Sequence, residues 1–272
     1  MVKIVCFIRK QPVTVYFVNT IHETHKVDLV VIEKPSRLQF IIGLVKFKGL
    51  LGAAKTILDR FLFKTWKSEL YNQLFSDAWR NLNKDIQVLV VDSVNSSIVC
   101  EKIRETQPNL LLVHGTSIVK PEIVNNVKLG LNLHWGLSPY YRGAACTEWA
   151  LLNWDIYNIG VTIHTLAPEI DGGDIVAQAR VDVQPDDTVH SINMRLTYLG
   201  TELVTKIMNQ IVCGQQLNFV KQDLFLGYLN IKKQFSKHLV KQIEFIEKNG
   251  IIKTILKRPS RKEKLPIIML KD

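Results

Sequence analysis

The regular succession of short apolar runs and helical segments is the feature that most constrains the fold of this chain. Short apolar runs occur at 3–8, 27–32, 86–91, 110–114 and 130–134, and segments with helical spacing of their apolar residues separate most of them. Strands that alternate with helices predict an α/β fold with a doubly wound, mostly parallel sheet. A chain of 272 residues is long enough for one such domain and a small appendage.

The pattern continues beyond residue 134 and then changes. It predicts a helix at 147–153, strands at 160–166 and 174–183, and a long helix from Ser191 to about residue 212 that Gly214 closes. After residue 215 the chain is irregular and apolar at 219–228 and helical at 237–248. We therefore expect a main domain over 1–214 and a small C-terminal subdomain over 215–272.

Residues 37–83 interrupt the alternation of strands and helices. This segment mixes apolar residues with lysines and arginines, and the lysines break the apolar run too early for a membrane span. A basic amphipathic helix pair can lie on a membrane surface. Most amphipathic helices instead pack on the protein with a solvated polar face, and we expect that arrangement for this insertion.

The charge and the cysteines limit the classes of function. A formal net charge of +10 predicts an acidic partner, such as a phosphorylated substrate, polyglutamate, nucleic acid or anionic lipid. The chain lacks the interleaved aromatic and basic residues of single-strand binders, which disfavours an RNA-binding module. A cytoplasmic protein with reduced thiols and without a metal site is expected, because no C-x-x-C motif and no signal peptide pattern is present. The four cysteines are Cys6, Cys100, Cys146 and Cys213.

Three polar residues stand where a site is expected in such a sheet. Asn132 and His134 fall at the carboxyl end of a predicted strand, the edge at which ligands bind in open α/β sheets. Asp171 lies in a loop further along the chain. An amide and an imidazole can donate hydrogen bonds to a developing oxyanion, and a carboxylate can accept a proton. Taken alone, the Asn-x-His pair is also compatible with an ordinary loop amide and a packed histidine.

Four sequence blocks occur in an order that is specific for one family. They are Val113-His114-Gly115, the stretch from Asn132 to Gly143, Gly160–His164 and Ile170–Asp174. Together they resemble the folate-dependent formyltransferases, whose fold is Rossmann-like and whose co-substrate is N10-formyltetrahydrofolate. The resemblance implies that Asn132 and His134 face the formyl oxygen and that Asp171 serves proton transfer. An inactive relative used as a scaffold is disfavoured by the intact trio.

The resemblance also implies the binding residues. Those expected to bind folate are His114, Gly115, Ile170, Gly172 and Asp174. Those expected to face the acceptor are Trp135, Tyr140, Tyr141 and Arg142. For His164, an auxiliary role and a packed, half-buried histidine are both open.

Two features that the chain lacks limit the choice of acceptor substrate. The segment after the first strand contains no glycine, which disfavours the phosphate loop of the glycinamide ribonucleotide enzymes. The residues after Gly214 do not have the pattern of the five-stranded barrel of the methionyl-tRNA enzymes. We expect a nucleotide-linked amino sugar of surface polysaccharide (lipopolysaccharide O-antigen) biosynthesis, with no nucleic acid partner. A homodimer is compatible with this assignment. An ornithine-type siderophore precursor and methionyl-tRNA are the alternative acceptors.

Overall fold

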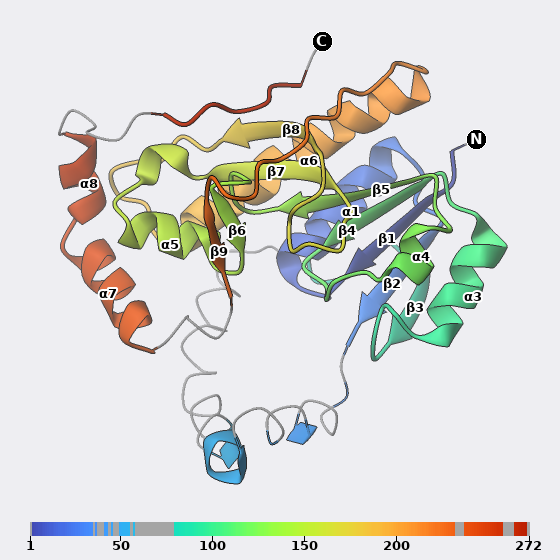
Figure 1. The fold of residues 1–272 in the computed structure, drawn as a ribbon, viewed down its shortest axis with the longest axis horizontal. Helices are drawn as coiled ribbons and strands as arrows, with labels where there is room; N and C mark the ends of the chain where they lie inside the picture. The colour runs from blue at the N-terminus through green and yellow to red at the C-terminus, as the bar shows by residue number, and fades with distance from the viewer. Residues whose placement is uncertain are drawn as a thin grey trace.

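A single seven-stranded sheet organises the described part of the chain. The computed structural model describes residues 2–34, 36, 41–42, 45, 49–54, 57, 79–231, 237–257 and 264–270. The strand order is β3-β2-β1-β4-β5-β7-β8, and a parallel pair of short strands, β6 and β9, lies beside it (Figure 1). The strands are β1 Ile4–Ile8, β2 Leu29–Glu33, β3 Gln87–Val91, β4 Leu110–His114, β5 Leu129–His134, β6 Tyr141–Gly143, β7 Gly160–Thr165, β8 Ile175–Arg180 and β9 Tyr228–Asn230.

The sheet is parallel from β3 to β5 and reverses beyond β5. β1, β2, β3, β4 and β5 pair in parallel, whereas β7 pairs antiparallel with both β5 and β8. The α/β class and the mostly parallel sheet predicted from the sequence are therefore confirmed. The reversal at β7 matters for the site, because its register places Asn132 opposite His164.

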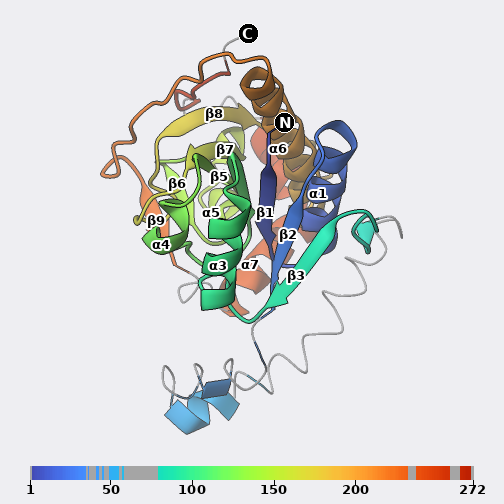
Figure 2. The ribbon, with the colours of Figure 1, turned by 90° about the vertical axis from the view of Figure 1, so that its right-hand side faces the viewer.

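Helices cover both faces of the sheet. Helices α1 and α6 contact each other on one face, while α3 and α4 pack on the other (Figure 2). The bounds of the helices are α1 Pro12–Thr24, α3 Ser97–Thr106, α4 Pro121–Val124, α5 Cys146–Leu152, the short 3₁₀ helix Ile156–Asn158, α6 Val189–Val212, α7 Lys237–Lys248 and α8 Ile251–Leu256.

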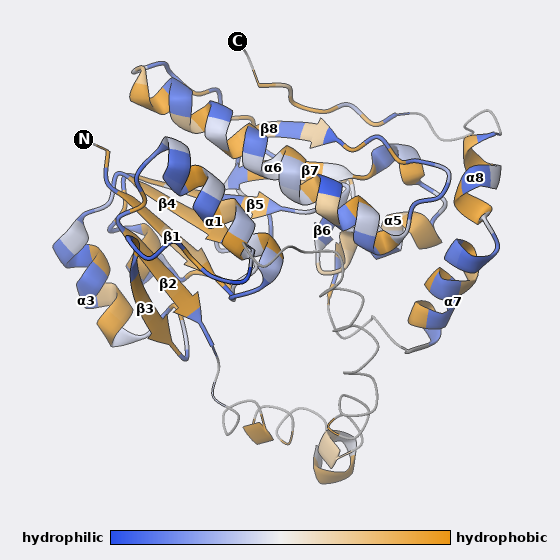
Figure 3. Ribbon diagram, turned by 180° about the vertical axis from the view of Figure 1, so that it is seen from behind, coloured by the Kyte–Doolittle hydropathy of each residue, from blue (hydrophilic) through white to orange (hydrophobic). Residues whose placement is uncertain are grey.

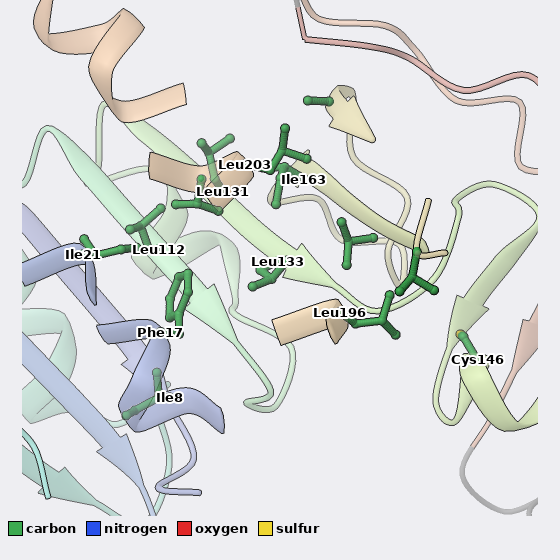
Figure 4. Packing of buried hydrophobic residues seen from close by; sticks show 14 of the residues in the cluster. Ile8, Phe17, Ile21, Leu112, Leu131, Leu133, Cys146, Ile163, Leu196 and Leu203 are labelled. Atoms are coloured by element: carbon green, nitrogen blue, oxygen red, sulfur yellow. The ribbon is translucent and has the colours of Figure 1, made fainter. Parts of the chain in front are cut away.

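Alternating side chains of the strands feed two apolar cores. In β1, Cys6 faces α1 and α6, whereas Phe7 faces α3 and α4. Figure 4 shows Phe17 and Ile21 of α1 close to Leu112 of β4. The central strands are therefore apolar on both sides, as the hydropathy colours in Figure 3 show. Such strands are expected where helices cover both faces of a parallel sheet.

Local sequence signals set the ends of the two longest packed helices. Pro12 is the first residue of α1, where its missing N–H is not needed. In α6, the Thr188 side chain accepts from the Ser191 backbone and the Ser191 side chain accepts from the Thr188 backbone. This reciprocal cap satisfies N–H groups that the first turn leaves without partners.

The structure adds elements that the sequence pattern did not predict. Residues 219–228 were expected to be irregular, but Val220 pairs with Ile175, and Tyr228 begins β9. The helix at 237–248 is confirmed, and α8 follows it directly after Gly250. The last described residues also reach the sheet, because the backbone N–H of Ile268 donates to Gln178. The domain boundary at 214 stays a prediction.

Two further expectations concern the insertion and the cysteines. Most of the predicted insertion 37–83 lies outside the described residues. No helix in the described part of the chain is long and apolar enough to span a membrane. Cys6 is buried as expected, whereas Cys100 is only half-buried. All four cysteines are free thiols.

Two isoleucines of α3 offer a matched test of the packing on this face. Ile103 is fully buried, whereas Ile98 is 52% exposed. We expect Ile103→Ala to lower the free energy of unfolding by about 2–5 kcal/mol, because it leaves a cavity in the core. Ile98→Ala should change it by about 0.5 kcal/mol or less. Urea unfolding of both variants measures the difference, and similar losses would show that α3 does not pack as described.

Candidate active site

The polar residues of β5 open onto a cavity at the carboxyl end of the parallel strands. Leu131 and Leu133 face the core with α6, so Asn132 and His134 face the opposite side of the sheet. There they line a cavity of about 390 Å³. We call it the strand-end cavity. Its lining comes from the ends of β4 and β5, the loops 115–119 and 166–171, His164, Gly143-Ala144 and Asn230-Ile231.

Asp171 is brought into this cavity by the loop between β7 and β8. Its Oδ2 accepts a hydrogen bond from the backbone N–H of Gly143 at 2.8 Å. Its Oδ1 lies 3.3 Å from Nδ2 of Asn132, and Oδ2 lies 3.4 Å from Nδ1 of His134. The three residues predicted as a catalytic trio therefore meet in one cluster, although 39 positions separate Asn132 from Asp171.

His164 is a fourth member of this cluster. Its Nδ1 donates to the backbone carbonyl of Thr165 at 2.8 Å, which leaves Nε2 directed at the other side chains. Nε2 lies 3.1 Å from Nδ2 of Asn132 and 3.5 Å from Oδ1 of Asp171. A neutral His164 thus accepts from Asn132, whereas a protonated His164 donates to Asp171. These contacts are compatible with the auxiliary role, which stays a prediction.

The carboxylate of Asp171 is held in its ionised form. Burial by itself raises the pKa of Asp171. His134, His164 and the Gly143 N–H lower this pKa by more than burial raises it, so it lies well below its ordinary value. Burial lowers the pKa of His134, and the Asp171 carboxylate opposes that effect. Nε2 of His134 donates to the backbone carbonyl of Tyr141 at 2.9 Å, so Nδ1 is the nitrogen that faces Asp171.

Two glycines allow the chain to approach the cluster closely. Gly143 has a φ of +90°, and a Cβ on it would lie 2.1 Å from the carbonyl oxygen of Asn230. A Cβ on Gly173 would lie 1.8 Å from the carbonyl oxygen of Thr165. The first contact brings the Gly143 N–H to Asp171, and the second presses the Asp171 loop against the end of β7. A side chain at either position would displace this backbone.

The residues expected to bind folate divide into two groups. His114, Gly115 and Ile170 line the strand-end cavity. Gly172 and Asp174 belong to the turn beside it: the N–H of Gly172 donates to Glu169, and that of Asp174 donates to the Thr165 hydroxyl. Folate binding by all five residues stays a prediction.

The residues expected to face the acceptor lie beside the cavity and not in its lining. The Tyr141 hydroxyl is buried and donates to Asp155 at 2.7 Å. The Arg142 guanidinium is also buried and donates to the carbonyls of Ile170 and Leu224. The Trp135 ring packs at 5.4 Å from the His114 ring, and Tyr140 is half-buried. Tyr141 and Arg142 therefore form hydrogen bonds to neighbouring parts of the chain, outside the cavity lining. Their roles as acceptor ligands stay predictions.

The sequence pattern did not identify several residues of the site. Gly143 provides a backbone N–H to Asp171, a role that residue type does not reveal. Asn230 and Ile231 line the cavity, although they lie in the segment expected to form a separate subdomain. No local motif marks them, because β9 brings them here only by pairing with β6. Among the described residues, no group of three or more His, Cys, Asp and Glu side chains could hold a metal ion.

The family follows from a comparison with known proteins. The model of the formyl transferase family matches residues 62–208, which include the whole cluster around Asp171. The chain belongs to the formyl transferase family.

Individual relatives add the following similarities. The methionyl-tRNA formyltransferase of Chlorobium chlorochromatii is 30% identical over 140 residues, which are 51% of this chain and 44% of that protein. Two solved structures share the fold. The N-formyltransferase of Helicobacter canadensis, in complex with folinic acid and dTDP-3-aminofucose, has a TM-score of 0.56 at 19% identity, covering 87% of this chain and 73% of that one. The 4-N formyltransferase of Francisella tularensis has a TM-score of 0.54 at 18% identity, covering 90% and 87%.

A buried histidine on the cavity wall is expected to make the stability of this chain sensitive to acid. Burial lowers the pKa of His114 to about 4, with smaller effects from the Leu133 carbonyl and from His134. Below pH 6.5 the unfolded chain therefore takes up a proton that the folded chain does not, and stability falls as the pH drops toward 4. Between pH 7 and pH 5, the wild type should lose about 2 kcal/mol more unfolding free energy than His114→Gln.

Urea unfolding at the two pH values provides the measurement. His238→Gln is the control, because His238 is an exposed histidine on α7 and the variant should keep the wild-type loss. An equal loss in wild type and His114→Gln would contradict the buried, neutral state of His114.

Proposed function

We propose that the chain transfers a formyl group from N10-formyltetrahydrofolate to the amine of a nucleotide-linked amino sugar. The observation that carries this proposal is the cluster of Asn132, His134, His164 and Asp171 on the strand-end cavity. It combines hydrogen-bond donors with an ionised carboxylate in one site. Those are the groups that the attack of an amine on a formyl carbon requires.

The chemistry can be followed at the atoms of this cluster. The amine attacks the formyl carbon, and the carbonyl oxygen becomes an oxyanion. Nδ2 of Asn132 supplies an N–H for that oxygen, in exchange for one of its present contacts with His164 and Asp171. The Asp171 carboxylate accepts the proton that the attacking nitrogen loses. The bond from carbon to the folate nitrogen then breaks, and the Asp171–His134 pair returns a proton to that leaving nitrogen.

The wall of the cavity at residues 115–119 suits a folate. This loop presents backbone groups and the side chains of Ile118 and Val119, and Leu166 and Ile170 add apolar surface. A flat heterocycle with polar edges is complementary to such a surface. The H. canadensis N-formyltransferase, which shares the fold, was solved with folinic acid bound.

The choice of acceptor rests on the fold neighbours and the charge. The solved structures that share this fold include N-formyltransferases, one of which holds dTDP-3-aminofucose. A formal net charge of +10 suits a diphosphate and the glutamate tail of folate. A role in surface polysaccharide biosynthesis, in the cytoplasm and as a homodimer, belongs to the same proposal.

Methionyl-tRNA is the second candidate acceptor. It is favoured by the sequence relatives, because the C. chlorochromatii protein is named a methionyl-tRNA formyltransferase. The chain spans less than half of the length of that relative, so the relative's substrate does not transfer to it directly. The two candidates differ in size and in the number of phosphates that they present.

An acceptor panel is expected to separate these candidates. We expect the full chain, with formyl-tetrahydrofolate, to add one formyl group to a nucleotide-linked amino sugar such as dTDP-3-aminofucose. Mass spectrometry detects the gain, and charged initiator tRNA and ornithine are assayed in parallel under the same conditions. Formylation of the tRNA at a comparable rate would contradict the proposed acceptor, and no transfer to any amine would contradict the activity.

Substitutions in the cluster test the roles of its residues. We expect Asn132→Ala to lower kcat by about 10²–10³, the typical cost of one oxyanion donor. His134→Ala should lower kcat by about 10²-fold or more, because the return of the proton to the leaving nitrogen loses one partner. Asp171→Asn keeps the shape of the side chain but cannot accept the proton, so it should be close to inactive and should still bind folinic acid. Circular dichroism and folinic acid titration check folding and binding. Near-normal turnover in any of the three variants would remove that residue from the mechanism.

A further inference from the structure

The loop that carries Asp171 is held in an unusual backbone conformation. Asp171 has a φ of +48°, in the left-handed region that residues with a side chain rarely adopt. Such a conformation is energetically unfavourable and persists only where the surroundings fix it. The cluster itself binds only the carboxylate oxygens of Asp171. The backbone of the loop needs other partners.

Those partners are two side chains behind the loop. Nε2 of Gln222 donates to the carbonyl oxygen of Asp171 at 3.0 Å and to that of Gly173. Nη1 of Arg142 donates to the carbonyl oxygen of Ile170 at 3.3 Å. Three carbonyls of the loop are thus bound by side-chain donors. Gln222 provides two of these bonds, and it is 8% exposed.

The segment that carries Gln222 is anchored at both ends. At one end, Val220 and Ile175 exchange backbone hydrogen bonds of 2.8 and 2.9 Å. At the other end, the N–H of Ala144 donates to the carbonyl of Asn230 at 2.7 Å, where β9 pairs with β6. Between the anchors, the carbonyl of Leu224 accepts from Nη2 of Arg142 at 3.1 Å. The segment 220–230 is therefore fixed against the sheet, and Gln222 is held in place by it.

We propose that Gln222 is a positioning residue for Asp171. By binding the Asp171 carbonyl, it holds the backbone in the left-handed conformation that directs the carboxylate toward Asn132 and His134. Gln222 lies beyond residue 208, where the match to the formyl transferase family ends, so the family match does not assign it a role. The inference rests on the proposed function, because it assigns Gln222 to the same reaction.

The substitution Gln222→Met tests this role. Methionine has a similar length but no donor, so the Asp171 carbonyl loses its partner. We expect kcat for formyl transfer to dTDP-3-aminofucose to fall by about 10- to 100-fold, since a small misplacement of a reacting group has an effect of this order. KM for the sugar and the dissociation constant of folinic acid should change by about twofold or less, because Gln222 does not line the cavity.

A matched control and a double variant separate positioning from a general loss of stability. Gln216→Met is the control, because Gln216 is an exposed glutamine a few residues earlier, and kcat should not change. In the Asp171→Asn background, adding Gln222→Met should lower the residual kcat by about twofold or less, because the carboxylate through which it acts is gone. A full further loss in that background, or an unchanged kcat in Gln222→Met, would overturn the proposal.

A second readout does not need an acceptor. Asp171 raises the pKa of His134, while burial, His164 and Arg142 lower it. We expect the titration midpoint of His134, followed by NMR of histidine-labelled protein, to fall in Gln222→Met and to fall further in Asp171→Asn. An Asp171→Asn shift without any Gln222→Met shift would exclude the positioning role. If the wild type transfers no formyl group, this titration still decides the role of Gln222 while the proposed function fails.

Discussion

A buried carboxylate is the constraint on which the rest of the site depends. The side chain of Asp171 is enclosed by protein, and an ionised group in such a place costs several kcal/mol unless its oxygens are bound. Here a backbone N–H, an amide and two imidazoles surround the two oxygens. These partners come from β6, β5 and β7. The fold therefore has to bring three separate strands and one loop to the same point.

The topology of the sheet explains how this is done. Helices α3 and α4 cover one face of the sheet by packing on apolar residues of β1, β2, β3 and β4. On the same face, β5 and β7 present polar side chains, while Leu133 and Ile163 of these two strands join the core on the other face. The antiparallel register of β7 then sets His164 beside Asn132. The cavity thus forms where the sheet continues with polar residues beyond the apolar surface that α3 and α4 pack on.

Features that depend on local interactions could be predicted from the sequence, whereas features that depend on contacts between distant parts of the chain could not. Period and apolar composition are local properties, and they indicated the strands of the sheet and the polar positions Asn132 and His134. The cluster itself was expected only through the resemblance, because no local pattern connects Asp171 with Asn132. The strand β9 was missed, since three residues with exposed Tyr228 and Leu229 carry no period and form a strand only against β6. For the same reason, the sequence did not indicate that Gln222 binds the Asp171 carbonyl or that Asn230 lines the cavity.

The segment after α6 contacts the site, although its sequence pattern does not predict such contacts. Its irregular pattern indicates an appendage, yet its hydrogen bonds to Ile175, Asp171 and Ala144 join it to the cluster around Asp171. A carboxylate that must change its protonation during a reaction cannot be fixed by its own oxygens alone, because those bonds alter with each proton transfer. Bonds to the backbone carbonyl of Asp171 do not alter in this way. A partner such as Gln222 can keep the loop in place through every step, and this explains why support from outside the sheet is useful at this position.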